Sequence, residues 1–77
     1  MKKYVFTPSI DDDKMQKYFN TNHYSIVSYD DQPLFDFQND INNSLKNYNI
    51  TRSGKKNGKL YNSRDEEIGE YNIRTNE

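Results

Sequence analysis

The first apolar cluster of the chain predicts a short strand at its N-terminal end. Residues 2–7 contain Tyr4, Val5 and Phe6, and residue types of this kind are enriched in strands. Pro8 follows, and proline cannot donate a backbone hydrogen bond to a neighbouring strand. We therefore expect this strand to stop at Pro8.

A helical spacing of apolar residues comes next. Ser9 or Asp11 can cap a helix, and the three aspartates at 11–13 favour the positive end of the helix dipole. We expect the helix to run from about residue 11 to residue 20. Its apolar stripe, at spacings of three and four, consists of Met15, Tyr18 and Phe19.

A second strand is predicted over residues 24–29, after the turn-prone residues 20–23. Alternation along a strand places Tyr24 and Ile26 on one face. Val27 and Tyr29 then lie on the opposite face.

The segment that follows the turn at residues 30–33 has two interpretations. In the first, a long helix begins at Pro33, with Asp31 or Gln32 as its cap, and carries one apolar stripe. In the second, residues 34–37 pair with residues 25–29 as a hairpin, and a shorter helix covers about residues 38–47. We favour the long helix, because its stripe has four apolar positions before Tyr48. The stripe is Leu34, Phe37, Ile41, Leu45 and Tyr48.

The last third of the chain, residues 48–74, reads as three short strands joined by two polar turns, at 52–59 and 63–67. If residues 64–67 close the second hairpin, Leu60 faces Tyr71, and both share a face with Ile73. Ile50 joins that face if the first turn has an odd number of residues. The opposite face would carry Lys59, Tyr61, Ile68, Glu70 and Asn72.

These elements predict a small single domain of the α+β class over residues 1–77. We expect a mostly antiparallel sheet of about five strands, with two helices on one face and a C-terminal three-stranded meander. So short a chain buries only a small core. The predicted core residues are Phe6, Ile26, Ile41, Leu45, Leu60 and Tyr71.

The composition and motifs of the chain exclude several classes of functional site. The chain has no cysteine, which excludes disulfides, a thiolate nucleophile and thiolate metal ligands, and makes a reducing cytoplasm the expected compartment. It has no apolar run of the length that a signal peptide or membrane span needs.

Residues 54–60 lack the spacing of a phosphate-binding loop, and the aspartate runs lack the spacing of a calcium loop. His23 has no recognisable catalytic partner. We therefore expect no enzyme activity, no metal and no cofactor.

Charge is divided unevenly along the chain, although its formal net value is only −1. Residues 1–40 carry four lysines and seven aspartates, whereas residues 41–77 carry seven cations and five carboxylates. An acidic protein-binding surface is predicted at Asp11, Asp12, Asp13, Asp30 and Asp31, with Tyr29 beside it. The alternative is a nucleic-acid surface on the basic ribbon at Arg52, Lys55, Lys56, Lys59 and Tyr61.

In its size, its lack of cysteine, its eleven asparagines and its absence of catalytic motifs, the chain resembles the small accessory proteins of bacteriophages and mobile elements. Many of these inhibit a host enzyme such as a CRISPR or restriction nuclease. The resemblance implies a protein that is not an enzyme and inhibits a host protein by stoichiometric binding. We expect it to act in the bacterial cytoplasm, as a monomer or homodimer.

Overall fold

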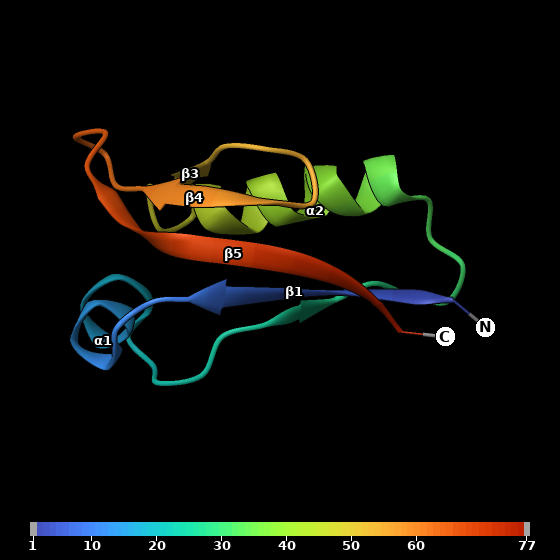
Figure 1. The fold of residues 1–77 in the computed structure, drawn as a ribbon, viewed down its shortest axis with the longest axis horizontal. Coiled ribbons are helices and arrows are strands. Elements are labelled where there is room, and N and C mark those ends of the chain that lie inside the picture. Colours follow the sequence, from blue (N-terminus) through green and yellow to red (C-terminus); the bar gives the residue numbers. More distant parts are fainter. Residues whose placement is uncertain (1, 77) are drawn as a thin grey trace.

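The computed structural model describes residues 2–76 and contains five strands and two helices, so the predicted α+β class is confirmed (Figure 1). The sheet order is β2-β1-β5-β4-β3, and every neighbouring pair is antiparallel. The predicted C-terminal meander is formed by the last three strands. In chain order the elements are β1 (Lys3–Ser9), α1 (Asp12–Phe19), β2 (Ile26–Val27), α2 (Leu34–Lys46), β3 (Thr51–Arg52), β4 (Asn57–Tyr61) and β5 (Glu67–Asn76).

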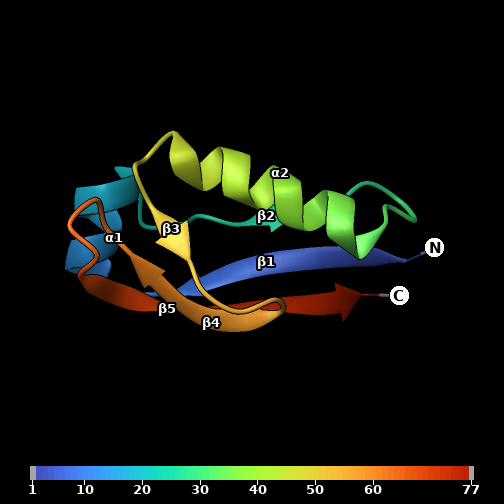
Figure 2. The ribbon, with the colours of Figure 1, turned by 90° about the horizontal axis from the view of Figure 1, so that it is seen from above.

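The helices have different positions relative to the sheet. α2 lies along one face, and the sheet curls so that β3 rises toward it (Figure 2). α1 lies at the end of the molecule where β1 finishes. The opposite, outer face of the sheet has no helix against it, which is the usual arrangement for an antiparallel sheet with one apolar face.

The core is a single cluster in which aromatic and aliphatic side chains mix. Five of the six predicted core residues are buried, and the sixth, Ile26, is partly buried and packs against the cluster. Aromatic rings stack within it, for example Tyr4 on Phe37 with ring centroids 6.0 Å apart. The buried apolar residues are Tyr4, Phe6, Met15, Phe19, Phe37, Ile41, Leu45, Ile50, Leu60, Ile68, Tyr71 and Ile73.

α2 confirms the long-helix interpretation, because residues 34–37 are helical. Phe37, Ile41 and Leu45 of the predicted stripe are buried against the sheet. The capping differs from the prediction. Pro33 is itself the N-cap, one residue before the helix, and neither Asp31 nor a side-chain hydrogen bond caps it.

α1 and β2 are shorter than predicted, although the faces that they present are correct. α1 has Asp11 as its N-cap, without a side-chain hydrogen bond, and ends at Asn20 in the left-handed region. β2 covers two residues, Ile26 and Val27, which pair with Phe6 and Val5 of β1. Ile26 is only partly buried, whereas we had predicted a core residue. Val27 and Tyr29, on the opposite face, are exposed.

β1 does not stop at Pro8, contrary to the prediction, but continues to Ser9 in register with β5. Tyr4 accepts a hydrogen bond from Ser28 N, so the backbone of Tyr4 points toward β2. By alternation the nitrogen of Pro8 points to the same side, beyond the end of β2. The proline therefore removes no donor from the ladder with β5.

The register of the second hairpin also differs from the prediction. Leu60 pairs with Gly69 instead of Tyr71, and Tyr71 pairs with Gly58. Ile68 is an extra residue between the partners of Leu60 and Tyr61, which makes it the bulged residue of the pair. The bulge turns Ile68 into the core instead of onto the outer face, where we had expected it.

Candidate protein-binding surface

Three side chains form an apolar strip on the outer face of the sheet, which we call the Tyr29 strip: Val5, Val27 and Tyr29. Val5 and Val27 are register partners, so their side chains share a face. Ser28 N donates to Tyr4 O at 2.9 Å, which extends this pairing and puts Tyr29 opposite Lys3. Val27 is 54% exposed and Tyr29 is 62% exposed. Of the three, only Tyr29 was a predicted site residue, although the alternation also indicated Val27.

Two buried polar side chains, Ser28 and Gln32, fix the backbone of the segment that carries this strip. Ser28 Oγ accepts a hydrogen bond from Tyr4 N at 2.8 Å. Gln32 Oε1 accepts from Tyr29 N at 3.3 Å, and Gln32 Nε2 donates to Asp40 Oδ2 on α2 at 2.8 Å. The segment that carries Tyr29 is therefore fixed both to β1 and to α2. Sequence patterns gave no signal for this role of Gln32.

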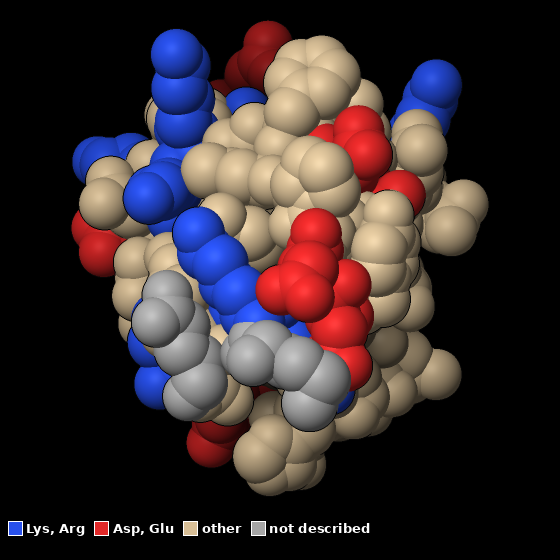
Figure 3. Space-filling model, turned by 90° about the vertical axis from the view of Figure 1, so that its right-hand side faces the viewer, with Lys and Arg blue, Asp and Glu red and all other residues tan. Residues whose placement is uncertain are grey.

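Asp30 and Asp31 lie directly after the strip and contact the start of β1. Asp30 forms an ion pair with Lys3 at 3.5 Å, in which both side chains are nearly half exposed. Asp31 Oδ1 accepts a hydrogen bond from Lys2 N at 3.1 Å, and Asp31 N donates to Lys2 O at 2.7 Å. Acidic and basic side chains accordingly lie next to one another at this end of the molecule (Figure 3).

The other predicted acidic residues, Asp11, Asp12 and Asp13, are not part of this surface. They lie at the start of α1, at the opposite end of the long axis from the connection between β2 and α2 (Figure 1). That axis measures 36 Å. The acidic half of the sequence therefore forms two separate clusters, and only Asp30 and Asp31 accompany Tyr29.

The predicted basic surface is divided as well, because Arg52 points inward. Arg52 is the register partner of buried Leu60, so its side chain lies on the inner face. Its Nε donates to Asn42 Oδ1 at 2.7 Å, and its Nη1 donates to Gly54 O at 3.0 Å and to Tyr71 Oη at 2.8 Å. The guanidinium thus ties the basic turn to α2 and β5.

Lys59 and Tyr61 lie on the outer face of β4, away from Arg52. Lys59 Nζ contacts Glu67 Oε1 at 3.1 Å, and the hydrogen bond and the negative charge of Glu67 raise the pKa of Lys59. Glu70 is the register partner of Lys59. Carboxylates therefore neutralise this part of the ribbon.

Lys55 and Lys56 are left as the exposed cations of the turn itself. Lys55 O accepts from Gln38 Nε2 at 2.8 Å, and Lys56 O accepts from Ile73 N at 2.6 Å. Gly54 has a φ of +79°, in the region that favours glycine. These hydrogen bonds fix the turn to α2 and β5. Of the five residues predicted to bind nucleic acid, the turn itself exposes Lys55 and Lys56.

His23, the single histidine, is an exposed loop residue. Its backbone N–H donates to Thr21 Oγ1 at 3.2 Å. Within residues 2–76 no group of three His, Asp or Glu side chains is placed to hold a metal ion. The same span contains no helix with the length and apolarity that crossing a bilayer requires.

Comparisons with protein-family models, with curated proteins and with solved structures give no match.

Proposed function

We propose that this chain is a protein-binding module that acts stoichiometrically through the Tyr29 strip together with Asp30 and Asp31. One observation carries the proposal: Tyr29 and Val27 are exposed side by side on an edge of the sheet, on a segment that Gln32 and Ser28 hold in place. Tyrosine is enriched at protein interfaces because it covers a large area with few torsions to restrict.

The target that we propose is a basic surface on a host nucleic-acid enzyme, such as a CRISPR or restriction nuclease. Two arguments support this choice. Asp30 and Asp31 lie beside an aromatic anchor, and Asp30 can exchange its half-exposed ion pair with Lys3 for lysines or arginines of the partner. The chain also shares its size and composition with phage accessory proteins that inhibit such enzymes.

The experiment is an inhibition titration against a panel of purified CRISPR and restriction nucleases. We expect cleavage by the target to fall linearly with added protein and to stop at a fixed molar ratio. Tyr29→Ala should weaken inhibition by about thirtyfold, the effect of losing an interface residue worth about 2 kcal/mol.

Phe35→Ala is the matched control, because Phe35 is 71% exposed, lies on α2 and is not part of the strip. It should inhibit like the parent protein. Inhibition that continues far below molar equivalence would contradict stoichiometric binding, and full activity of Tyr29→Ala would contradict the strip.

The nucleic-acid alternative rests on Lys55 and Lys56, since Arg52 and Lys59 have partners within the fold. It predicts that the isolated protein binds DNA or RNA with an affinity that falls steeply with added salt. Lys55→Glu with Lys56→Glu should then remove that binding. Tight, salt-sensitive binding of this kind would reverse our ranking of the two functions.

A further inference from the structure

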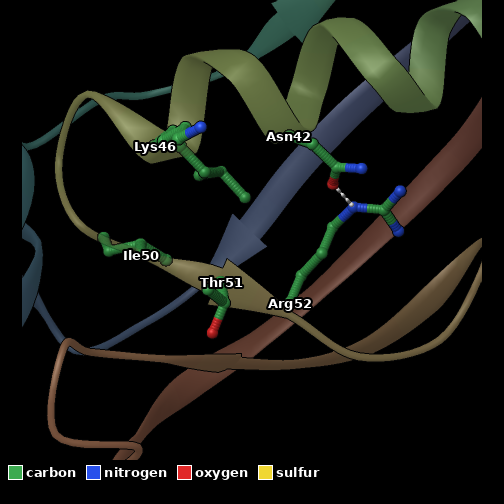
Figure 4. Close-up of a pocket in the computed structure, with 6 residues that line it drawn as sticks. Asn42, Lys46, Ile50, Thr51 and Arg52 are labelled. Carbon is green, nitrogen blue, oxygen red and sulfur yellow. Dashed lines mark hydrogen bonds between the residues drawn. The ribbon is translucent and has the colours of Figure 1, made fainter.

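A pocket of about 350 Å³ lies between the C-terminal half of α2 and the edge strand β3 (Figure 4). We call it the α2–β3 pocket. Leu45 and Ile50 lie beneath it and are almost completely buried, so the core fixes its shape, and the aliphatic carbons of Lys46 and Arg52 supply its accessible apolar part. The lining residues are Asn42, Leu45, Lys46, Ile50, Thr51 and Arg52.

The polar lining of this pocket is rich in hydrogen-bond donors. Its two charged residues, Lys46 and Arg52, are both cations, and no carboxylate lines it. Arg52 Nε donates to Asn42 Oδ1 at 2.7 Å, so the Asn42 amide turns its oxygen toward Arg52 and its NH₂ group away from it (Figure 4). A ligand with acceptor oxygens and a negative charge matches these groups.

The last backbone carbonyls of α2 already accept hydrogen bonds, so they do not add free acceptors to the donors of the pocket. Ser44 O accepts a hydrogen bond from Asn47 N, and Leu45 O accepts from both Tyr48 N and Ile50 N. Lys46 O accepts from Asn49 N at 3.0 Å. The carbonyls nearest the pocket are therefore occupied, while Lys46 remains exposed at its rim.

The backbone of β3 adds an open strand edge on the same side. Ser53 N donates to Lys59 O at 2.9 Å, so Ser53 faces β4. In an antiparallel pair the direction alternates, so the N–H and C=O of Arg52 point away from β4, to the free edge of the sheet. An extended peptide can pair with such an edge while its side chain enters a pocket.

We propose that the α2–β3 pocket binds the C-terminal residue of a partner polypeptide. The apolar side chain of that residue packs on the aliphatic carbons of Lys46 and Arg52, its carboxylate accepts hydrogen bonds from Lys46 and Asn42, and its backbone pairs with Arg52. Charge complementarity and the open edge both select a peptide terminus. The site is at the opposite edge of the sheet from the Tyr29 strip and does not depend on it.

The test measures binding of an acetylated hexapeptide that ends in leucine, as the free acid and as the C-terminal amide. Isothermal titration calorimetry gives the affinities, and ¹H–¹⁵N NMR spectra of the labelled protein locate the site. We expect the acid to bind at least tenfold more tightly than the amide, with shifted amide signals concentrated in residues 42–52.

Lys46→Gln should weaken binding of the acid by about fivefold to tenfold and leave binding of the amide unchanged. Lys55→Gln removes the same charge from the neighbouring turn and should bind both peptides like the parent chain. Arg52 is left unchanged because its hydrogen bonds hold the turn.

Three results would overturn the proposal. The first is equal affinity for acid and amide, and the second is a set of shifted signals outside residues 42–52. The third is binding of N-acetyl-leucine as tight as that of the hexapeptide, since a free apolar carboxylate would then account for the site without a peptide backbone.

Discussion

Asn62 organises the second hairpin turn through one buried side chain. Its Oδ1 accepts hydrogen bonds from Arg64 N at 2.9 Å and Glu66 N at 3.0 Å. Its Nδ2 donates to Glu66 Oε1 at 2.9 Å and to Tyr18 Oη on α1 at 3.1 Å. All the hydrogen-bonding groups of this amide are therefore used, and it connects the turn to a helix 44 residues earlier in the chain.

Replacing Asn62 by alanine should reduce the free energy of unfolding by about 1 to 3 kcal/mol, because the backbone donors of the turn lose their buried acceptor. Urea denaturation gives the value. Asn22→Ala, at an exposed loop position, is the control and should change the free energy by less than about 0.5 kcal/mol. An unchanged urea midpoint for Asn62→Ala would show that the turn forms without the Asn62 side chain.

The same turn makes stability depend on pH. The hydrogen bond from Asn62, followed by the charge of Arg64, lowers the pKa of Glu66. A carboxyl group whose pKa is lower in the folded protein stabilises the fold above its unfolded pKa, and the effect is lost as the pH falls through the folded value.

Glu66→Gln keeps an acceptor oxygen but removes the charge. We therefore expect the parent protein to be more stable than this variant at neutral pH and the difference to vanish in acid below the pKa of Glu66. Thermal unfolding followed from pH 7 to pH 2 measures it. A difference that stays constant over this range would contradict the role of the charge.

α2 contributes Phe37, Ile41 and Leu45 to the core. Leu45 has no exposed surface, so Leu45→Ala should cost about 2 to 5 kcal/mol, which in a domain of this size is enough to prevent folding. Phe35→Ala removes a larger side chain from the same helix, but an exposed one, and should leave the melting temperature nearly unchanged. An unchanged melting temperature for Leu45→Ala would contradict the packing of α2.

The elements with a continuous apolar stripe were predictable from the sequence, and the hairpin register was not. The spacing of Phe37, Ile41 and Leu45 was sufficient to find α2. The register of β4 on β5 depends on the turn at Asn62 and on the bulge at Ile68. The turn depends on hydrogen bonds to the Asn62 side chain, and the bulge is one extra residue in β5, and no apolar pattern records either of them.

The candidate sites were predictable only where strand alternation decides them. Alternation placed Val27 and Tyr29 on the outer face. It also implied that Arg52 points inward, because Arg52 lies two residues after buried Ile50. We had nevertheless expected Arg52 on a basic surface. The distance between the two aspartate clusters depends on how the sheet orders its strands. Asn42 and Lys46 became pocket residues only through the position of β3 beside α2.

At the scale of the whole molecule, the separation of the acidic clusters makes charge effects local. Asp30→Asn with Asp31→Asn keeps the side-chain shapes and suits the left-handed backbone of Asp31, whose φ is 60°. If the surface binds a basic partner, this variant should associate several-fold more slowly at physiological salt. Stopped-flow binding to the inhibited nuclease measures the rate.

Asp12→Asn with Asp13→Asn removes the same two charges from the other end of the molecule. It should associate like the parent protein, because charges farther away than the Debye length of about 8 Å at physiological salt are screened. Equal slowing of both variants would mean that net charge, and not the Tyr29 end, controls association.

The strand order also has a consequence for how the chain is made. β1 and β5 are paired along seven residues at the centre of the sheet, yet they are the first and last strands in the sequence. While the ribosome still holds residues 67–76 in its exit tunnel, β1 has no partner on that side and the core cannot close. The core can therefore close only once residues 67–76 have left the tunnel, and its apolar residues remain accessible to chaperones until then.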